Sequence, residues 1–342
     1  MTSRNLVGID VGSKFIKAVQ VTETSGQYKV TEFGIAEVNP QVSVPDTINE
    51  LFSKKNFKTK RVVSAVSGRF VFVRYISMPV MSDEELVNAA KYELGKYIPV
   101  EVDEVLHDSQ KLEELAAQEG QEPEMRVLLV AAKRTFIDEH VGVLEGAGLQ
   151  PAIVDVDSFA LGNAYELSGT INAQAIAQGK LVALVDIGAS KTNINIMSDT
   201  VSYFTREFYK GGDDLTDSIS KKLSLEVKDA EALKRNPGGE MDKVNDCITS
   251  VVEDICHDIN ISIDYFENQY DKKVEEVYIT GGASATQGLQ ETLERTVQKP
   301  VQRWNPLQFL ELELPRDSQQ ELENNPAQAA IALGLASRVR RD

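Results

Sequence analysis

The sequence predicts an α/β fold of two related lobes, with a small α+β unit between them. Three observations lead to this expectation. The length of 342 residues suits two domains with separate cores, and strands alternate with helices over most of the chain. An Asp-x-Gly strand–turn–strand pattern also occurs twice, as VGIDVGSKFIKAV and ALVDIGASKTNIN, with Asp10 and Asp186 at equivalent places. Such self-similarity indicates two related halves that face each other.

The first 80 residues alternate apolar and polar side chains with the period of β-strands. One helix is expected at residues 45–55, where Pro45 and Asp46 suit the first turn. The expected strands are residues 5–11, 14–21, 28–38, 61–68 and 70–78.

The following segment predicts the small α+β unit. Ser82 and Glu85 form a capping box, so a helix is expected from there to about Leu94. An acidic loop at 113–123 separates two paired strands. The remaining elements are strands at 104–112, 124–134 and 151–157 and a helix at 135–149.

The second half repeats the strand–turn–strand pattern and then becomes helical after Gly211 and Gly212. A strand, a glycine-rich turn and a helix follow at 274–297. The other expected elements are helices at 158–167, 214–223, 228–235, 242–270 and 326–341, strands within 181–197 and at 200–208, and a loop at 171–180.

Composition narrows the function classes. The net charge of −17, from 36 basic and 53 acidic residues, argues against a general surface for nucleic acid or anionic lipid. Cys247 and Cys256 have no metal-ligand spacing and are expected to be buried apolar residues. The start lacks an apolar signal core, and no run reaches the roughly 18 apolar residues of a membrane span. A soluble cytoplasmic protein is expected.

Two hairpins whose turns meet in one cleft can grip a phosphate chain from both sides. The glycines let the backbone approach the ligand, and turn N–H groups and hydroxyls supply donors. Asp10 and Asp186 are expected to hold Mg²⁺ through its waters, because Mg²⁺ keeps much of its hydration shell. Ser13 and Lys14 are expected to meet phosphate oxygens, whereas Lys17 lies further into the strand and is left open as a surface residue.

A third piece, YITGGASATQGL, is a strand that ends in Gly-Gly before a helix. This arrangement lets a nucleotide lie against bare backbone at a helix N-terminus. Each piece alone is weak, because a lone Asp-x-Gly hairpin is more often structural. The combination in this order predicts a nucleotide cleft.

The motifs DVGSKFIK, DIGASKTN and GGAS resemble those of the actin/Hsp70/sugar-kinase family. The resemblance implies an actin-like, ribonuclease H-like two-lobed fold, ATP as the nucleotide, two phosphate loops and an adenosine loop. It also implies that Glu231 and Lys234, at E-x-x-K spacing in DAEALK, face the purine and ribose; the alternative is a solvated ion pair on a surface helix. The candidate nucleotide-binding residues are Asp10, Gly12, Ser13, Lys14, Asp186, Gly188, Ala189, Ser190, Lys191, Thr192, Gly211, Gly212, Glu231, Lys234, Gly281, Gly282, Ala283 and Ser284.

The resemblance can be narrowed. The segments MPVMSDEELVNAAKYELGKYIPV, TREFYKGGDDLTDSI and AIALGLASR are spread from end to end and resemble the PilM family, actin-like cytoplasmic proteins of type IV pilus assembly. Residues 80–153 resemble the extra subdomain that this family shares with the division protein FtsA. The resemblance therefore assigns residues 1–79, 154–180 and 326–342 to the first lobe, 80–153 to the insertion and 181–325 to the second lobe.

The resemblance also implies a partner. PilM-like proteins bind the short cytoplasmic N-terminal tail of a single-span inner-membrane protein, PilN, in a groove between the first lobe and the insertion. The residues of this neighbourhood are Met78, Pro79, Val80, Leu86, Tyr92, Tyr97 and Ile98. The alternative for each of them is a place in the subdomain core, since periodic apolar residues of a helix are usually core.

No residue is identified as catalytic. Phosphoryl transfer needs a group that orients the attacking water, and the three histidines form no triad or metal pattern. Asp155 and Asp157 either border the cleft or end a strand and cap a helix. The expectation is ATP binding with slow or negligible hydrolysis.

The leading interpretation is an ATP- and Mg²⁺-binding scaffold, cytoplasmic and held at the inner membrane by a PilN-like partner, with self-association left open. No nucleic acid and no direct membrane insertion is expected. The second is an FtsA-like division protein that forms filaments at the membrane; the chain ends at LASRVRRD without an amphipathic targeting helix, which favours the first. The third, a sugar kinase, would need a substrate-binding acid and a catalytic base, and neither is apparent.

Overall fold

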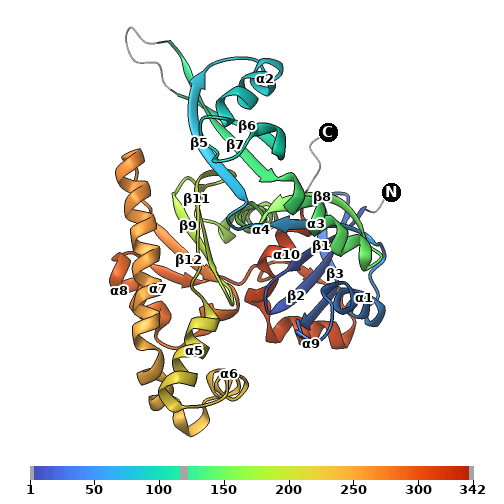
Figure 1. Ribbon diagram of the computed structural model, residues 1–342, viewed down its shortest axis with the longest axis vertical. Coiled ribbons are helices and arrows are strands. Elements are labelled where there is room, and N and C mark those ends of the chain that lie inside the picture. The colour runs from blue at the N-terminus through green and yellow to red at the C-terminus, as the bar shows by residue number, and fades with distance from the viewer. Residues whose placement is uncertain (1–3, 116–121, 339–342) are drawn as a thin grey trace.

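Two lobes lie side by side, and a small third unit projects beyond them (Figure 1). The computed structural model describes residues 4–115 and 122–338. In Figure 1 the N-terminal strands and α1 lie in one lobe, helices α5 to α8 lie in the other, and α2 lies in the projecting unit.

The first lobe contains a six-stranded sheet with the strand order β14-β3-β2-β1-β4-β8. Strands β1, β2 and β3 form an antiparallel meander, whereas β4 and β8 continue the sheet in parallel from β1. Helices α1 (Val44–Lys54) and α3 (Arg134–Gly146) bury Ile48 and Leu144 in the same cluster as Ile9. The strands are β1 (Arg4–Val11), β2 (Phe15–Thr24), β3 (Gln27–Glu37), β4 (Arg61–Val66), β8 (Gln150–Val156) and β14 (Glu311–Leu312).

The second lobe repeats this arrangement. Its five-stranded sheet has the order β11-β10-β9-β12-β13, with an antiparallel meander from β9 and parallel strands on its other side. The topology therefore confirms the prediction of two related halves. The strands are β9 (Val182–Ile187), β10 (Thr192–Ser198), β11 (Val201–Phe208), β12 (Glu276–Thr280) and β13 (Val301–Arg303), and the helices are α5 (Gly212–Leu223), α6 (Val227–Arg235), α7 (Met241–Tyr270) and α8 (Leu289–Val297).

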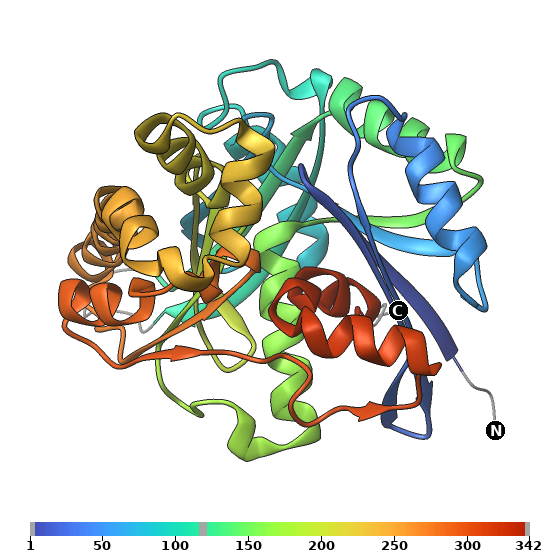
Figure 2. The same ribbon diagram turned by 90° about the horizontal axis from the view of Figure 1, so that it is seen from below.

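Two helices of small residues hold the lobes together. Helix α4 (Asp157–Ile171) and helix α10 (Ala330–Ala336) lie between the sheets, as Figure 2 shows from below. The backbones are so close that a Cβ at Gly334 would lie 1.7 Å from the carbonyl oxygen of Ala160, and one at Gly8 would lie 2.0 Å from that of Ala332. The buried cluster around these helices draws side chains from both sheets.

The projecting unit has its own sheet and core. Strands β5 (Val71–Pro79), β7 (Glu124–Lys133) and β6 (Val105–Leu115) form a three-stranded antiparallel sheet that α2 (Asp83–Leu94) covers. Since β5 pairs along its length with β7, it belongs to this unit, whereas the sequence analysis drew the boundary after it. Helix α3 packs with α1 of the first lobe, so the far boundary also lies earlier than residue 153.

A second boundary differs as well. Residues that follow β13 return to the first lobe, although the sequence analysis kept them in the second lobe to residue 325. Strand β14 pairs with β3, and α9 (Arg316–Asn324) buries Leu322 in the same cluster as Phe33. Tertiary pairing decides this, because a two-residue strand has no periodicity to read.

Most local predictions are confirmed. The capping box of α2 is present, with Ser82 and Glu85 each accepting the other's backbone N–H, and Cys247 and Cys256 are buried. The last predicted helix is a 3₁₀ turn (Pro326–Ala329) followed by α10. The acidic loop lies largely outside the described residues, as does the basic end beyond residue 338. None of the described helices is both long and apolar enough to cross a bilayer. The remaining short 3₁₀ segments are Val102–Glu104, Ala173–Ala175, Gly238–Glu240 and Gly282–Ala285.

Candidate functional site

The turns of the two repeated hairpins meet between the lobes. Each turn is closed in the same way, by a bond from the Gly12 amide to the Phe15 carbonyl (3.1 Å) and from the Gly188 amide to the Lys191 carbonyl (2.9 Å). The Ser13 hydroxyl donates to the Ser190 hydroxyl at 3.0 Å, across 177 positions of sequence. The structure thus brings together the two predicted phosphate loops.

The two aspartates have different surroundings. Asp10 lies opposite Lys17 in the β1–β2 ladder, and its Oδ2 is 2.6 Å from the Lys17 Nζ. Asp186 lies opposite Asn193 in the β9–β10 ladder, and none of the ion pairs among the described residues includes it. Burial raises the pKa of Asp186 to about 6, and the negative charge of Asp10 adds to this rise.

Gly281 lets the end of β12 approach Asp186. Its φ is +89°, a conformation that favours glycine. A Cβ at this position would lie 2.4 Å from the Asp186 Oδ1 and 2.6 Å from the Ile187 carbonyl oxygen. The predicted Gly-Gly turn is therefore packed directly against the second hairpin, and bare backbone is required there.

Gly211 and Gly212 hold the second loop in place. The amides of Gly212 and Asp213 donate to the carbonyl oxygens of Gly188 and Ala189 at 2.9 and 2.8 Å. A Cβ at Gly211 would lie 2.6 Å from both carbonyl oxygens. These first amides of α5 are thus engaged by the loop, so the two glycines position it.

Glu231 and Lys234 form a cluster that reaches across the cleft. Lys234 lies 2.7 Å from the Glu231 carboxylate and donates to Thr216 at 2.6 Å. Lys14 of the first lobe lies 3.0 Å from the same carboxylate and 3.6 Å from Asp213. Because Glu231 and Lys234 side chains are only 14% and 17% exposed, the alternative of a solvated surface pair does not describe them.

The charges in this cluster are strongly coupled. Burial raises the pKa of the Glu231 carboxyl, but the hydrogen bonds that it accepts, first from Lys234, outweigh burial and hold this pKa well below its usual range. Arg235 also contacts Glu231 at 2.7 Å and lies over the Phe15 ring of the first lobe at 5.2 Å. Two side chains of α6 therefore touch the first hairpin.

A second cluster crosses the cleft at its inner end. Lys191 of the second hairpin lies 2.7 Å from the Asp157 carboxylate at the start of α4 and also donates to Ser67. Ser67 donates to the same carboxylate at 2.7 Å. Burial raises the pKa of Asp157, but the Lys191 ammonium outweighs it and lowers this pKa overall. Glu207 accepts from the Gly68 amide at 3.0 Å and completes the cluster.

Several predicted residues also make hydrogen bonds within the fold. The Thr192 hydroxyl donates to the Lys210 carbonyl and is fully buried, and the Ser284 hydroxyl donates to the Gly281 carbonyl. Of the two acids left open, Asp155 is paired with Arg338 and Asp157 contacts Lys191 of the second hairpin. Neither caps α4, whose N-cap is Val156 without a side-chain hydrogen bond. Gly282 and Ala283 lie in the turn after β12.

Sequence reasoning missed Ser67, Thr216 and Arg235. Ser67 directly follows β4, which is parallel to β1, and carboxyl ends of parallel strands are where α/β folds build sites. That rule could have identified it. Nothing in the sequence marks Thr216 or Arg235, whose contacts depend on how α5 and α6 pack.

The residues can accommodate a hydrated Mg²⁺. Among the described residues, no three or more His, Cys, Asp or Glu side chains converge on one point. Mg²⁺ does not need such a cage, because it is commonly held by one or two carboxylates with waters and phosphates. Asp186, which has no ion-pair partner in the described chain, fits this role, whereas Asp10 is engaged by Lys17.

The residues predicted for a partner groove divide into two sets. Met78, Leu86 and Ile98 are buried in the core of the projecting unit, so they are closed to a partner in this structure. The other four are exposed, with Tyr92 exposed by 76%. Val87, which the sequence analysis did not name, lies on the same helix and is 63% exposed. The exposed predicted residues are Pro79, Val80, Tyr92 and Tyr97.

Comparison with known proteins assigns a family. A sequence model described as type IV pilus assembly protein PilM matches residues 8–340. The cell division protein FtsA of Streptococcus pneumoniae serotype 2 (strain D39) is 24% identical over 263 residues, covering 68% of this chain and 55% of FtsA. The chain thus spans about half the length of this curated relative.

Solved structures agree on the fold. The PilM-PilN type IV pilus biogenesis complex matches with a TM-score of 0.82 and 25% identity, over 97% of both chains. MreB5 of Spiroplasma citri bound to ADP matches with a TM-score of 0.50 and 12% identity, over 97% of this chain and 94% of that one. The second likeness shows the fold alone. The prediction of an actin-like fold is confirmed.

Proposed function

The chain belongs to the family of the type IV pilus assembly protein PilM, and from this premise we propose that it is an ATP-binding scaffold that holds a membrane partner. The partner is the short cytoplasmic N-terminal tail of a single-span inner-membrane protein similar to PilN. The protein would therefore work in the cytoplasm, at the inner membrane.

The meeting of the two hairpin turns carries the nucleotide part of this proposal. The contact of Ser13 with Ser190 at 3.0 Å brings a hydroxyl of each hairpin turn to one point, beside the backbone of both turns. Such turns bind phosphate oxygens well, because their N–H groups point outward and no side chain intervenes at glycine. Glu231 and Lys234 lie beside the same cleft, where they would contact the ribose and base.

Mg²⁺ would accompany ATP, and its chemistry there is to neutralise phosphate charge. Asp10 and Asp186 are the candidate carboxylates for its waters. Because Gly281 has no side chain, its backbone lies close to the Asp186 carboxylate. Lys14 would have to leave the Glu231 carboxylate, or share it, when a phosphate chain enters beside Ser13.

We expect slow or negligible hydrolysis. A fast ATPase needs a group that is free to orient water in line with the γ-phosphate. Asp157, the acid nearest that description, is already engaged by Lys191 and Ser67. ATP would then act as a clamp between the lobes, and it would alter partner binding only if the partner surface differs between open and closed states.

The nucleotide proposal is tested by calorimetric titration of the whole chain with ATP in Mg²⁺. We expect saturable binding that the double variant Ser13→Ala/Ser190→Ala weakens by about tenfold or more, since two hydroxyl donors are lost. Ser53→Ala removes an exposed hydroxyl on α1 and serves as the control. Equal affinity of the double variant and the control would contradict a phosphate role for the hairpin turns.

The partner proposal rests on the likeness to PilM in its complex with PilN over 97% of the chain. Tagged protein with MgATP would be used to capture partners from solubilised native membranes and cytosol. We expect a small single-span protein with a short cytoplasmic tail. A synthetic peptide of that tail should bind the wild type more tightly than Tyr92→Ala, while Tyr265→Ala on α7, which removes a comparably exposed tyrosine, should leave binding unchanged.

Recovery of a tubulin-like filament protein without such a membrane partner would contradict the scaffold proposal. That outcome would instead assign the chain to the division branch, to which the FtsA likeness points more distantly.

A further inference from the structure

The two repeated hairpins place different residues opposite their aspartates. Asp10 pairs with Lys17 in the β1–β2 ladder, and Asp186 pairs with Asn193 in the β9–β10 ladder. In both hairpins the aspartate lies two residues before the glycine whose amide closes the turn, and the facing residue lies two after the residue whose carbonyl accepts that amide. The positions are therefore equivalent, and only the first carries a built-in cation.

The Lys17 ammonium is fixed at Asp10. Its Nζ lies 2.6 Å from the Asp10 Oδ2 and donates to the Phe15 carbonyl at 3.2 Å. The two side chains are 13% and 14% exposed, so this pair is screened less than surface pairs. A Cβ at Gly12 would lie 3.0 Å from the same Nζ. The ammonium thus lies at the foot of the phosphate loop, against one of the two carboxylate oxygens of Asp10.

The lysine of the second hairpin is also engaged in an ion pair. Lys191 is paired with Asp157 at 2.7 Å. The ammonium groups of Lys17 and Lys191 therefore pair with carboxylates other than Asp186. Lys17 pairs with Asp10, and Lys191 pairs with Asp157 and, at 4.0 Å, with Glu207. In the described chain, Asp186 takes part in no ion pair and no side-chain hydrogen bond. A positive charge to pair with Asp186 would therefore have to enter with the ligand.

We propose that the two repeats divide the charge of the nucleotide site: Lys17 neutralises Asp10 from within the chain, so that the cation entering with ATP is held through Asp186 and not through Asp10. The inference rests on the proposed nucleotide site and sharpens its metal assignment. Lys17 is in this view a positioning residue. It keeps Asp10 from competing for the metal.

The experiment measures the affinity for ATP of the full-length protein twice, once in Mg²⁺ and once in EDTA, and takes the ratio. Asp186→Asn is expected to reduce the enhancement by Mg²⁺ to about twofold or less. Asp10→Asn should change the affinity in both conditions alike and keep the ratio of the wild type. Lys17→Gln should raise the ratio about tenfold, because Asp10 then becomes available to the metal.

Two further proteins make the result secure. Asp10→Asn leaves Lys17 without its partner and could unfold, so the double variant Asp10→Asn/Lys17→Gln, which leaves no unpaired charge, asks the same question; its ratio should equal that of the wild type. Lys54→Gln removes an exposed lysine of α1 that pairs with Glu50 and is the control. Thermal melts monitored by circular dichroism establish that each variant is folded.

The outcomes separate the two proposals. A loss of the Mg²⁺ enhancement in the Asp10 variants, or equal losses at Asp10 and Asp186, overturns the division of charge while leaving the nucleotide site intact. The absence of ATP binding by the wild type in both conditions overturns the nucleotide site and this inference with it. Loss at Asp186 alone supports the inference.

Discussion

Two clusters of charge join the lobes across the cleft, and they are built differently. In the inner cluster a single ammonium group, Lys191, lies 2.7 Å from the Asp157 carboxylate and 4.0 Å from that of Glu207. In the outer cluster one carboxylate, Glu231, lies within 3.0 Å of Lys14, Lys234 and Arg235 at once. The inner pair belongs to α4 and the second hairpin, and the outer group belongs to α6 and the first hairpin.

The two clusters differ in what happens when one charged side chain is removed. Where a buried carboxylate has only one cation, removal of that cation leaves it uncompensated, which is costly. In a shared cluster, removal of one cation leaves the carboxylate with others, whereas removal of the carboxylate leaves several like charges close together. The inner cluster is therefore suited to remain closed, and the outer one can exchange a cation when the cleft opens for a ligand.

The largest expected effect is at the inner pair. Lys191→Met leaves Asp157 without its counter-charge beside α4, and we expect the free energy of unfolding to fall by about 3–5 kcal/mol. Denaturant unfolding of the nucleotide-free protein measures this. Lys54→Met, at an exposed pair on α1, is the control and should stay within about 0.5 kcal/mol of the wild type. A loss below about 1 kcal/mol at Lys191 would show that the inner pair is no tighter than a surface pair.

Asp186 belongs to neither cluster, and its removal should stabilise the protein. Its pKa is raised from 3.8 to about 6. The folded state therefore disfavours its charge, and this cost is absent below about pH 4 and complete above pH 6. Asp186→Asn is expected to gain up to about 3 kcal/mol at pH 8 without nucleotide. Melting curves at several pH values check this; a constant difference across that range would contradict it.

Removal of the shared carboxylate tests the outer cluster. Glu231→Gln is expected to cost about 2 kcal/mol at pH 7, because charge-assisted hydrogen bonds are lost and the cations repel each other. The pKa of Glu231 is depressed, so the stabilisation is present above the ordinary carboxyl pKa and is lost as the pH falls through the depressed value. Wild type and variant should therefore converge in strong acid. A pH-independent difference would assign the cost to packing instead.

The smallest effect should come from a single cation of the outer cluster. Lys14→Gln is expected to cost under about 1 kcal/mol, since Lys234 and Arg235 still satisfy Glu231. A double-mutant cycle with Glu231→Gln isolates the cross-lobe coupling. A cost as large as that of Lys191→Met would remove the distinction between the two clusters.

The sequence predicts the chemistry of the cleft better than it predicts the boundaries of the lobes and of the projecting unit. The two hairpins and the Gly-Gly turn are local motifs; Ser13 contacts Ser190, and Gly281 packs against Asp186, as the motifs predict. Thr192 and Ser284 carry suitable hydroxyls, but backbone carbonyls of their own neighbourhood take those donors. Residue type indicates what a side chain can do, and only packing decides whether it is free to do it.

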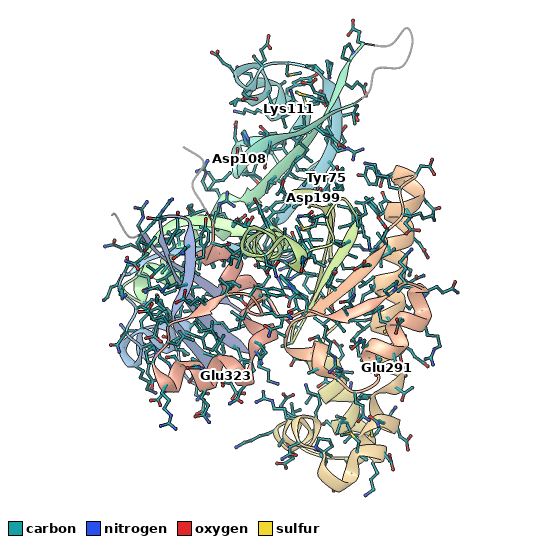
Figure 3. All side chains as sticks on the ribbon, turned by 180° about the vertical axis from the view of Figure 1, so that it is seen from behind. Tyr75, Asp108, Lys111, Asp199, Glu291 and Glu323 are labelled. Carbon is teal, nitrogen blue, oxygen red and sulfur yellow. The ribbon has the colours of Figure 1, made fainter. Side chains whose placement is uncertain are left out.

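The projecting unit shows the same limit. The apolar period of α2 identifies the helix, but it does not distinguish the residues that face the core from those that border it. Leu86 is buried and Tyr92 is 76% exposed on this one helix. Figure 3 shows how Tyr75 of β5 lies beside the second lobe, where its hydroxyl is 2.7 Å from that of Ser202, a contact between segments that are 127 positions apart.

The sequence by itself determined the repeated hairpins, most helices and the family, because periodicity, capping and turn chemistry act over a few residues. The tertiary structure alone decided that β5 belongs to the projecting unit and that residues 304–324 return to the first lobe. It also decided that Lys17 neutralises Asp10 while Asp186 stays unpaired, and that Glu231 is shared by three cations. These outcomes depend on which charges and backbones are brought within a few ångströms across the fold. Coulombic and packing energies vary steeply at that range and leave no periodic trace in the chain.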